Sequence, residues 1–384
     1  MRNVYLDYNA TTPVAPSVVE AMGPFWTEHF GNASSAYRLG TISRAAIEEA
    51  RGNVASLVGG QPQEIVFTSG GTESNNLALL GAIRGWETRQ GHGVGHVVIS
   101  AIEHPAVSGP ATELRRLGYE VSVCPCDRNG VLDLSALEDL LRPQTVLVSV
   151  MLANNETGAI QPVREISKLC RPRGILLHTD AAQAIGKMRV DVTELGVDLL
   201  TMAGHKFYAP KGIGALFVRD GVLLGRVLFG ANQELGLSPG TECVPLVVGL
   251  GRAAQLAVRI DREHMERQAR LRDQLEQRIA EGIDADVRIH ASGTERLSNT
   301  SSLAFPGLTG RDLLAEVPDL SASTGAACHT GQAGVSATLK AMRVPPRVAA
   351  GTIRLSTGWP TSEDEIALAA DWLIAAWERL ITRV

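Results

Sequence analysis

Between about residues 64 and 230, short apolar runs alternate with stretches in which apolar residues recur at helical spacing. Runs rich in β-branched residues that alternate with helical patterns are typical of a parallel sheet covered by helices. The pattern predicts strands at residues 64–67, 97–100, 146–150, 175–178 and 199–202. Because ligands in such folds bind beyond the carboxyl ends of the strands, the polar turns that follow these strands should converge on one site.

The pattern changes after about residue 240. A long helix rich in Arg and Glu is predicted from Leu246 to about Ala280, and it should connect to a smaller α+β part of the chain. The last helix is predicted to begin at a capping box, in which Ser362 and Glu365 satisfy each other's backbone N–H groups.

A chain of 384 residues, 45% of them hydrophobic, is long enough for two domains with buried cores. The predicted fold class is α/β, with a mostly parallel sheet in a large domain over residues 15–255. The predicted small domain combines residues 1–14 with an α+β part over residues 256–384.

The charge and hydropathy of the chain exclude some classes of function. The net charge of −5 gives no electrostatic footprint for nucleic acid or for an anionic membrane. No run approaches the roughly 20 apolar residues that span a bilayer, and the N-terminus lacks the apolar run of a signal peptide. We therefore expect a cytoplasmic protein that binds neither nucleic acid nor a membrane.

The chain has five cysteines and no CxxC pair, which argues against a disulfide framework and against a metal site built from cysteines. Cys124 and Cys126 flank a proline after an apolar run and are interpreted as structural thiols. Cys170 and Cys243 are expected to be buried structural cysteines. Cys328 differs because small residues and glycines surround it.

Only five lysines occur in the chain, and Lys206 stands in a Gly-rich turn after the predicted strand 199–202. Asp180 ends another strand, where it could also cap a helix or bind a metal. Gly70 and Gly71 follow a strand and open a helix, an arrangement that suits a phosphate but is common without one. Pyridoxal phosphate (PLP) needs a lysine for its aldehyde, an acid for its ring nitrogen and donors for its phosphate.

Motifs in a fixed order over nearly the whole chain extend this interpretation. With them the chain resembles the class V, fold-type I PLP enzymes, specifically the cysteine desulfurases of the NifS/IscS type and their relative selenocysteine lyase. The motifs that carry the resemblance are residues 5–13, 31–35, 69–76, 103–105, 154–158, 180–183, 203–206, 325–328 and 353–356.

The resemblance assigns roles around the cofactor ring. It implies that Lys206 holds PLP and then moves the Cα proton of the substrate. It implies that His104 stacks on the ring and takes part in acid–base steps. Asp180 would pair with the ring nitrogen and Gln183 with the ring hydroxyl group.

The phosphate group of PLP would be held by the amide of Gly71 and by the side chains of Thr72 and His205. The resemblance adds Thr241 from the partner subunit of a homodimer. Dimerisation is thus an implication of the family resemblance alone.

The resemblance also implies how the substrate L-cysteine is bound and used. Arg354, with Asn155, would bind the substrate carboxylate, for which a planar guanidinium is suited. Cys328, in an active loop of about residues 322–336, would attack the substrate sulfur as a thiolate and carry a persulfide while alanine leaves. A sulfur-acceptor protein would dock near this loop.

Three positions depart from the family pattern. Ala203 stands where a serine usually donates to the phosphate, and losing one such bond costs on the order of 1–3 kcal/mol of cofactor affinity. Ser238 replaces an arginine, and Tyr37 stands where a histidine is common. None of these departures changes Lys206, Asp180, Arg354 or Cys328, so we expect the chemistry to survive.

Several functions remain open. Cysteine desulfurase ranks first, selenocysteine lyase second, and another PLP lyase or aminotransferase third, because the third class does not need Cys328. A non-catalytic scaffold of a sulfur pathway is the fourth alternative, against which Lys206, Asp180 and Arg354 argue. The sulfur could serve iron–sulfur cluster assembly, tRNA thiolation, cofactor synthesis or DNA backbone sulfuration, and no motif selects among them.

Overall fold

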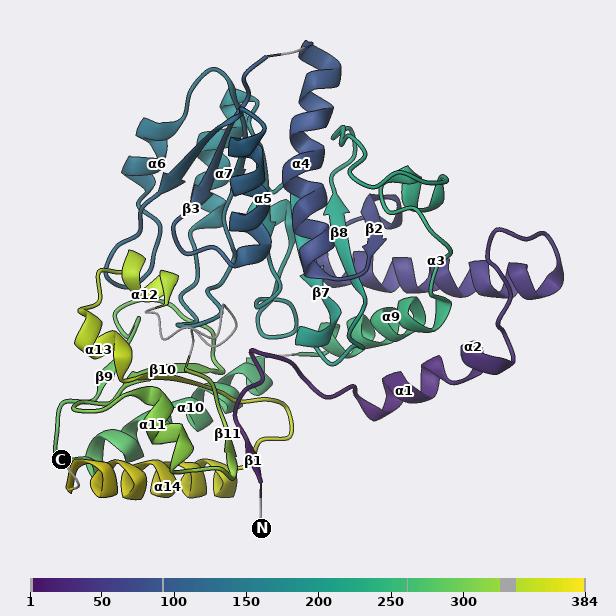
Figure 1. The fold of residues 1–384 in the computed structure, drawn as a ribbon. Coiled ribbons are helices and arrows are strands. Elements are labelled where there is room, and N and C mark those ends of the chain that lie inside the picture. Colours follow the sequence, from purple (N-terminus) through teal and green to yellow (C-terminus); the bar gives the residue numbers. More distant parts are fainter. Residues whose placement is uncertain (1–2, 92, 261, 325–335, 383–384) are drawn as a thin grey trace.

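Seven strands form the sheet at the centre of the larger body of the molecule (Figure 1). The computed structural model describes residues 3–91, 93–260, 262–324 and 336–382. Across the sheet the strands are β2 (Ile65–Thr68), β8 (Gly214–Val218), β7 (Leu199–Ala203), β6 (Leu176–Asp180), β5 (Thr145–Ser149), β3 (His96–Ser100) and β4 (Glu120–Cys124). Only β8 runs antiparallel to its neighbours. The predicted mostly parallel sheet is therefore confirmed.

The five predicted strands correspond to β2, β3, β5, β6 and β7, each within one or two residues. The pattern did not mark β8 or β4, and β4 lies at the edge of the sheet and is buried only at its last residue. An edge strand that is half exposed lacks the continuous apolar run on which the prediction relied.

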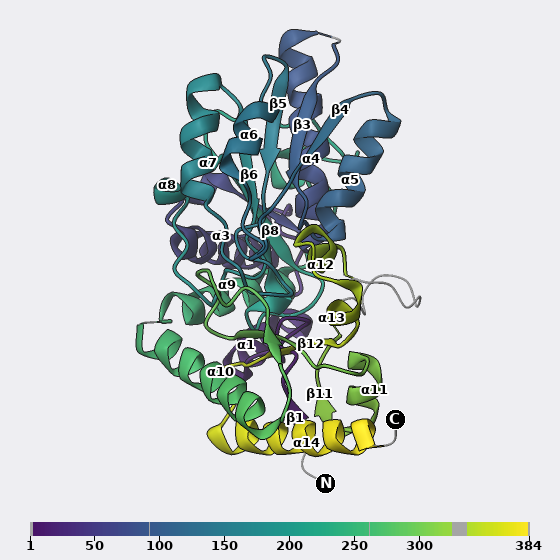
Figure 2. The same ribbon diagram turned by 90° about the vertical axis from the view of Figure 1, so that its left-hand side faces the viewer.

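Helices cover both faces of the sheet (Figure 2). Alternate side chains of a strand point to opposite faces, so Val97 and Ile99 pack on one side and Val98 on the other. The first face is covered by α4 (Gly71–Gln90) and α5 (Pro105–Arg116). The second face is covered by α3 (Arg38–Val58), α6 (Leu134–Leu140), α7 (Val163–Cys170), α8 (Val192–Leu195) and α9 (Val244–Val258). Two short helices, α1 (Pro16–Met22) and α2 (Pro24–Thr27), lie against α9.

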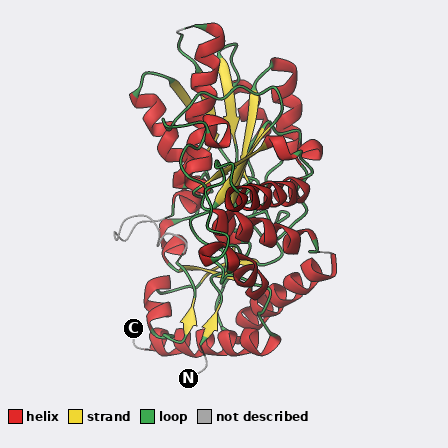
Figure 3. Ribbon diagram, turned by 90° about the vertical axis from the view of Figure 1, so that its right-hand side faces the viewer, coloured by secondary structure: helices red, strands yellow, loops and turns green. Residues whose placement is uncertain are grey.

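A second, smaller body has its own core. Its antiparallel sheet contains β12 (Thr352–Ser356), β10 (Thr300–Ala304) and β9 (Arg288–Ile289). Apolar side chains of α10 (Arg262–Gly282), α11 (Gly310–Ala315) and α14 (Glu363–Thr382) pack on that sheet. The N-terminal strand β1 (Val4–Tyr5) joins this body by pairing in parallel with β11 (Leu320–Ser321). The first and last described elements, β1 and α14, consequently lie at the same end of the molecule (Figure 3).

The single long helix predicted from Leu246 to about Ala280 is wrong, because the structure has two helices there. The first, α9, ends at Val258, and α10 begins at Arg262. Buried residues of α9 belong to the core of the larger body, whereas those of α10 belong to the core of the smaller one. The chain must change direction between the two cores, and a continuous helix cannot bury both faces.

The last helix begins as the sequence predicts. The Ser362 N–H donates to Glu365 Oε2 at 2.8 Å, and the Glu365 N–H donates to Ser362 Oγ at 3.2 Å. Two short helices, α12 (Ala337–Ala341) and α13 (Pro346–Ala350), lie between the two bodies. Within the described residues, no helix combines the length and the apolar character that crossing a membrane requires.

The packing of α9 against α3 gives a testable expectation. A Cβ atom added at Gly251 would lie 2.6 Å from the Cα and Cβ atoms of Ala50, so the two helix backbones are close together. We expect Gly251→Ala to destabilise the protein by about 1–3 kcal/mol through overpacking. Gly52→Ala is the matched control on α3, because a Cβ there meets nothing within 4 Å. It should stabilise by roughly 0.5–1 kcal/mol through helix propensity. Urea unfolding of both variants checks this, and equal midpoints would contradict the packing argument.

Candidate active site

A cavity of about 240 Å³ opens at the carboxyl ends of the parallel strands. It brings together nine of the site residues that the sequence predicts: Gly71, Thr72, His104, Asn155, Asp180, Gln183, His205, Lys206 and Arg354. Thr241 does not line this cavity and is exposed on the same chain. Cys328 lies outside the described residues. The turns after the parallel strands therefore converge on one cavity, as the sequence predicts.

The order of the strands explains why these residues meet. Gly71 follows β2, His104 follows β3, Asp180 ends β6, and Lys206 follows β7. These four strands run in the same direction, so the turns that follow them lie at one edge of the sheet.

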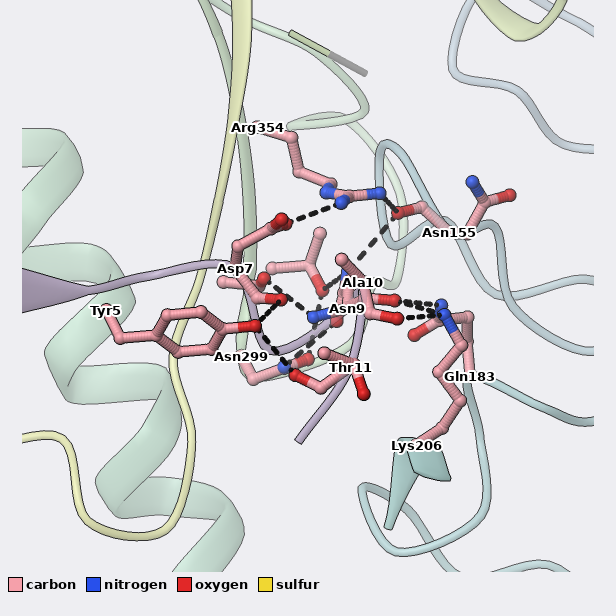
Figure 4. A network of polar contacts seen from close by, with 12 residues as sticks. Tyr5, Asp7, Asn9, Ala10, Thr11, Asn155, Gln183, Lys206, Asn299 and Arg354 are labelled. Carbon is pink, nitrogen blue, oxygen red and sulfur yellow. Dashed lines mark hydrogen bonds and ion pairs between the residues drawn. The ribbon is translucent and has the colours of Figure 1, made fainter. Parts of the chain in front are cut away.

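Lys206 holds the N-terminal segment against the cavity. Its Nζ donates to the carbonyl oxygen of Asn9 at 2.6 Å and to that of Ala10 at 2.8 Å (Figure 4). Both acceptors are neutral, and the amine also lines the cavity. A primary amine in this position can react with an aldehyde that enters the cavity.

Asp180 presents a buried carboxylate to the same cavity. Its Oδ2 accepts a hydrogen bond from Asn75 Nδ2 at 2.7 Å, and its Oδ1 accepts from the Ala182 N–H at 2.9 Å. The side-chain oxygen of Asn75, Oδ1, is buried and has no partner among the described residues. Asn75 therefore orients the carboxylate, which can pair with a cationic ring nitrogen.

The turn before α4 has the geometry of an anion site. Gly70 has a φ of 147°, which L side chains rarely adopt, and α4 is a 20-residue helix whose first N–H groups face the cavity end. A Cβ at Gly71 would come within 3.2 Å of the Cβ of Ala203. Ala203 lines the cavity with a methyl group, so the departure from serine removes one donor there.

The second departure, Ser238, has a definite partner. Its hydroxyl donates to Glu73 Oε1 at 2.7 Å. The other oxygen of Glu73 accepts from the N–H and the hydroxyl of Ser69 at 2.7 and 2.6 Å. Ser238 thus fastens its segment to the turn that precedes α4.

Two histidines, His205 and His104, line the cavity. Burial, together with Lys206, Lys211 and Lys187, lowers the pKa of His205 to about 4, so this ring is neutral at neutral pH. His104 caps α5, where its Nδ1 accepts from the Ala106 N–H at 3.1 Å. Since Nδ1 is the acceptor, Nε2 is the ring nitrogen of His104 that can hold or release a proton.

Arg354 is buried at the far side of the cavity (Figure 4). Its Nη2 donates to Asp7 Oδ1 at 2.6 Å, and its Nη1 donates to the carbonyl oxygen of Asn155 at 3.0 Å. Its Nε is buried without a partner in the described part of the chain. The guanidinium is thus oriented from one side and can still bind a carboxylate.

The other cysteines do not offer a nucleophile at the cavity. Burial raises the pKa of the Cys124 and Cys170 thiols to about 12 and that of Cys126 to about 11, so all three are thiols at neutral pH. Cys170 is buried as expected. The expectation for Cys243 is wrong, because this residue is exposed at the start of α9, at the end of a surface segment.

The residues present fit PLP. The cavity combines a lysine amine, a buried carboxylate, a helix N-terminus with glycines and a neutral histidine, which are the groups that the aldehyde, ring nitrogen and phosphate of PLP require. Two buried atoms at the same site, Oδ1 of Asn75 and Nε of Arg354, have no partner in the described residues and can each form a hydrogen bond with a bound group.

Four residues that support this site were not predicted from the sequence. Asp7 pairs with Arg354, Asn75 orients Asp180, and Asn9 and Lys187 bond to one another beneath the cavity. The first three lie inside the motifs that carry the family resemblance, so the motifs held a signal for them. Lys187 lies outside those motifs. The only signal for it in the sequence is that the chain has so few lysines.

Comparisons with known proteins agree with this geometry. The family model for class-V aminotransferases matches residues 4–368. The chain is 40% identical to the cysteine desulfurase IscS of Dictyoglomus turgidum, over 99% of this chain and 96% of that protein. It is 41% identical to the selenocysteine lyase of Bos taurus, over 99% of this chain and 94% of that protein. A solved NifS-like protein is similar with a TM-score of 0.87 and 35% identity, and the match covers 100% of both chains.

Glu103, next to His104, gives an expectation about stability and pH. Its Oε1 accepts from the Ser100 hydroxyl and, at 2.8 Å, from the Met151 N–H, whereas Oε2 is buried without a partner in the described residues. Burial raises the pKa of this carboxyl from 4.5 to about 8. A raised pKa means that the folded state favours the neutral form, so stability falls as pH rises from about 4.5 to about 8.

Glu103→Gln stays neutral and keeps an oxygen acceptor for both donors. We expect the wild type to lose unfolding free energy relative to this variant across that pH range, by at most about 1.4 kcal/mol per pH unit. Urea unfolding of both proteins at several pH values measures the difference. A difference that does not change with pH would rule out a buried neutral carboxyl.

Proposed function

We propose that this chain, which belongs to the class-V aminotransferase family, is a PLP-dependent cysteine desulfurase that converts L-cysteine to L-alanine. One observation supports this most strongly. Lys206, Asp180 and Arg354 line one cavity, and both described flanks of the segment that carries Cys328 are fastened beside it. Sulfur transfer requires a cavity for an amino acid and a cysteine that can reach it, and the described flanks of the segment lie where that reach is short.

We assign the holding of the cofactor to residues of the cavity. PLP supplies, when bound, an aldehyde for the substrate amine and a protonated ring that withdraws electrons from the substrate's Cα. Asp180 would pair with its ring nitrogen, Gln183 with its hydroxyl and His104 with the face of its ring. Its aldehyde carbon would bond to Lys206.

The phosphate would be bound by the Gly71 N–H, Thr72 and His205. A neutral His205 donates one hydrogen bond without adding a full positive charge. The partner subunit's Thr241 would add a further donor.

The substrate would be oriented by its carboxylate. Arg354 is a buried cation that donates to the Asn155 carbonyl oxygen, and its Nε has no partner in the described chain. A carboxylate there gains a charge-assisted hydrogen bond from a group that is already fixed by Asp7. Lys206, once the substrate amine has released it, would move the Cα proton, and Nε2 of His104 would serve the acid–base steps, because its Nδ1 is occupied.

The sulfur step is assigned to Cys328. Its thiolate attacks the substrate sulfur, so an S–S bond forms while the substrate's Cβ–S bond breaks. The electron pair of the broken bond remains on Cβ, where a proton completes alanine. The sulfur stays on Cys328 as a persulfide until an acceptor thiol takes it.

The flanks of this segment support the assignment. On the N-terminal side, Ser323 pairs with the backbone of Arg354, with N–H to carbonyl distances of 3.2 and 2.6 Å. On the C-terminal side, the Ser336 hydroxyl donates to the carboxylate of Glu156, the neighbour of Asn155. The segment that bears Cys328 therefore starts and ends beside the two residues assigned to the substrate carboxylate.

A selenocysteine lyase is the second candidate. The observation that favours it is the 41% identity to such an enzyme over 99% of this chain. Selenocysteine differs from cysteine only in its chalcogen, so the same cavity accommodates either substrate.

We further propose a homodimer. Large apolar side chains are exposed on two segments of the larger body, among them Phe30 (67% exposed), Phe229 (80%) and Leu235 (72%). Glu234 and Leu235 have positive φ angles of 47° and 60°, and the ion pair of Glu234 with Arg51 at 2.7 Å holds Leu235 outward. A partner surface would cover these residues and bring Thr241 to the neighbouring site.

Light scattering of the holoenzyme should give twice the chain mass of 40.9 kDa, and a monomer would contradict the dimer.

Turnover of cysteine tests the proposed function. With a reductant present, the wild-type holoenzyme should release alanine and sulfide in equal amounts. Cys328→Ala should lower this rate by at least ~100-fold. Cys243→Ala, which removes an exposed thiol away from the cavity, is the matched control and should stay within about twofold.

Selenocysteine is assayed in parallel. Turnover of selenocysteine alone would make the enzyme a selenocysteine lyase. Full activity of Cys328→Ala would instead point to an aminotransferase or another PLP lyase, and the desulfurase proposal would be abandoned.

A further inference from the structure

A second lysine, Lys187, lies beneath the cavity beside Lys206. Its Nζ donates to Asn9 Oδ1 at 2.7 Å and to Gln183 Oε1 at 2.5 Å. Lys187 and Lys206 line the same small cavity of about 20 Å³. Lys187 is not among the described residues that line the larger cavity. Its amine therefore does not face the space for cofactor and substrate.

Both acceptors of Lys187 are neutral amide oxygens. Burial, together with Lys206 and Arg354, lowers the pKa of Lys187 well below its ordinary value. In either protonation state the amine has at least two N–H hydrogens, which match the two oxygens it contacts. Its contacts therefore serve to orient amides rather than to neutralise an acid.

These contacts determine which way the Gln183 amide faces. Because the amine donates to it, the Gln183 atom on that side is the oxygen, and the nitrogen must lie on the other side. That nitrogen, Nε2, donates one hydrogen to the Asn9 carbonyl oxygen at 3.0 Å. Gln183 also lines the larger cavity, so its second N–H hydrogen is available to a group bound there.

The same amine fixes the side chain of Asn9. With Oδ1 turned to Lys187, Nδ2 of Asn9 donates to the Asn155 carbonyl oxygen at 3.3 Å and to Thr300 Oγ1 at 2.9 Å. The Asn155 carbonyl oxygen also accepts from Arg354 Nη1 (Figure 4). Lys187 is thus linked through one asparagine to the residues assigned to the substrate carboxylate.

We propose that Lys187 is a positioning residue that fixes the side-chain amides of Gln183 and Asn9, so that Gln183 presents a hydrogen-bond donor to the cofactor. It touches neither cofactor nor substrate and acts through these two amides. The proposal rests on the proposed function, because Gln183 is the residue assigned to the hydroxyl group of PLP.

A double-mutant cycle on PLP binding tests the proposal. The variants are Lys187→Met, Gln183→Leu and the two combined, and Lys168→Met on the exposed side of α7 is the matched control. The equilibrium dissociation constant of PLP is measured by titrating each cofactor-free protein, with thermal unfolding of the same samples beside it.

We expect Lys187→Met to weaken PLP binding by about five- to tenfold in the wild-type background. In the Gln183→Leu background the same change should weaken binding by less than about twofold, because the amide through which it acts is gone. Lys168→Met should leave the dissociation constant unchanged.

Equal weakening in both backgrounds would overturn the proposal, since Lys187 would then act by general stabilisation. No weakening in either background would overturn it as well. If Gln183→Leu alone leaves the affinity unchanged, the assignment of Gln183 fails, and the proposal fails with it while the cysteine assay above still stands.

Should Lys187→Met not fold, Gln183→Glu replaces it. That variant keeps an acceptor for Lys187 but lacks the donor, so it should bind PLP as weakly as Gln183→Leu, and wild-type affinity would refute the proposal.

Discussion

Hydrogen bonds to Asn9 hold together segments of the chain that are far apart in the sequence. This residue is 1% exposed, and its carbonyl oxygen accepts from Lys206 and Gln183. Its side-chain oxygen accepts from Lys187 and Asn299. Its own N–H donates to the Ser356 hydroxyl, in the smaller body. A buried amide is stable only when its partners are present, so the N-terminal segment and both bodies must be in place before the site exists.

The charges around this network suit the carboxylate of an amino acid and the phosphate of PLP. Lys187, Lys206 and Arg354 lie within one region of the structure, and burial together with Lys206 and Arg354 lowers the pKa of Lys187. Two carboxylates oppose them, Asp7 at Arg354 and Asp180 at the end of β6. The cavity therefore keeps an excess of donors, which the phosphate and the substrate carboxylate can use. Glu103 adds no negative charge at neutral pH, because burial raises the pKa of its carboxyl to about 8.

The sequence predicted the strands and the turns at their ends because a buried parallel strand is a continuous apolar run and its end is polar. Lys206 and Asp180 could be found in this way. Lys187 could not, because its contact with Asn9, a residue 178 positions away, comes from tertiary structure. The division between α9 and α10 was missed for a similar reason. Both helices have helical spacing, and only their burial in two different cores separates them.

Mass spectrometry tests most directly whether sulfur passes from the substrate to Cys328, as we propose. The holoenzyme is mixed with cysteine without a reductant, remaining thiols are blocked, and the peptide that contains Cys328 is weighed. We expect one added sulfur atom on Cys328 for each alanine formed in the first turnover. Formation of alanine with no sulfur added to that peptide would contradict it.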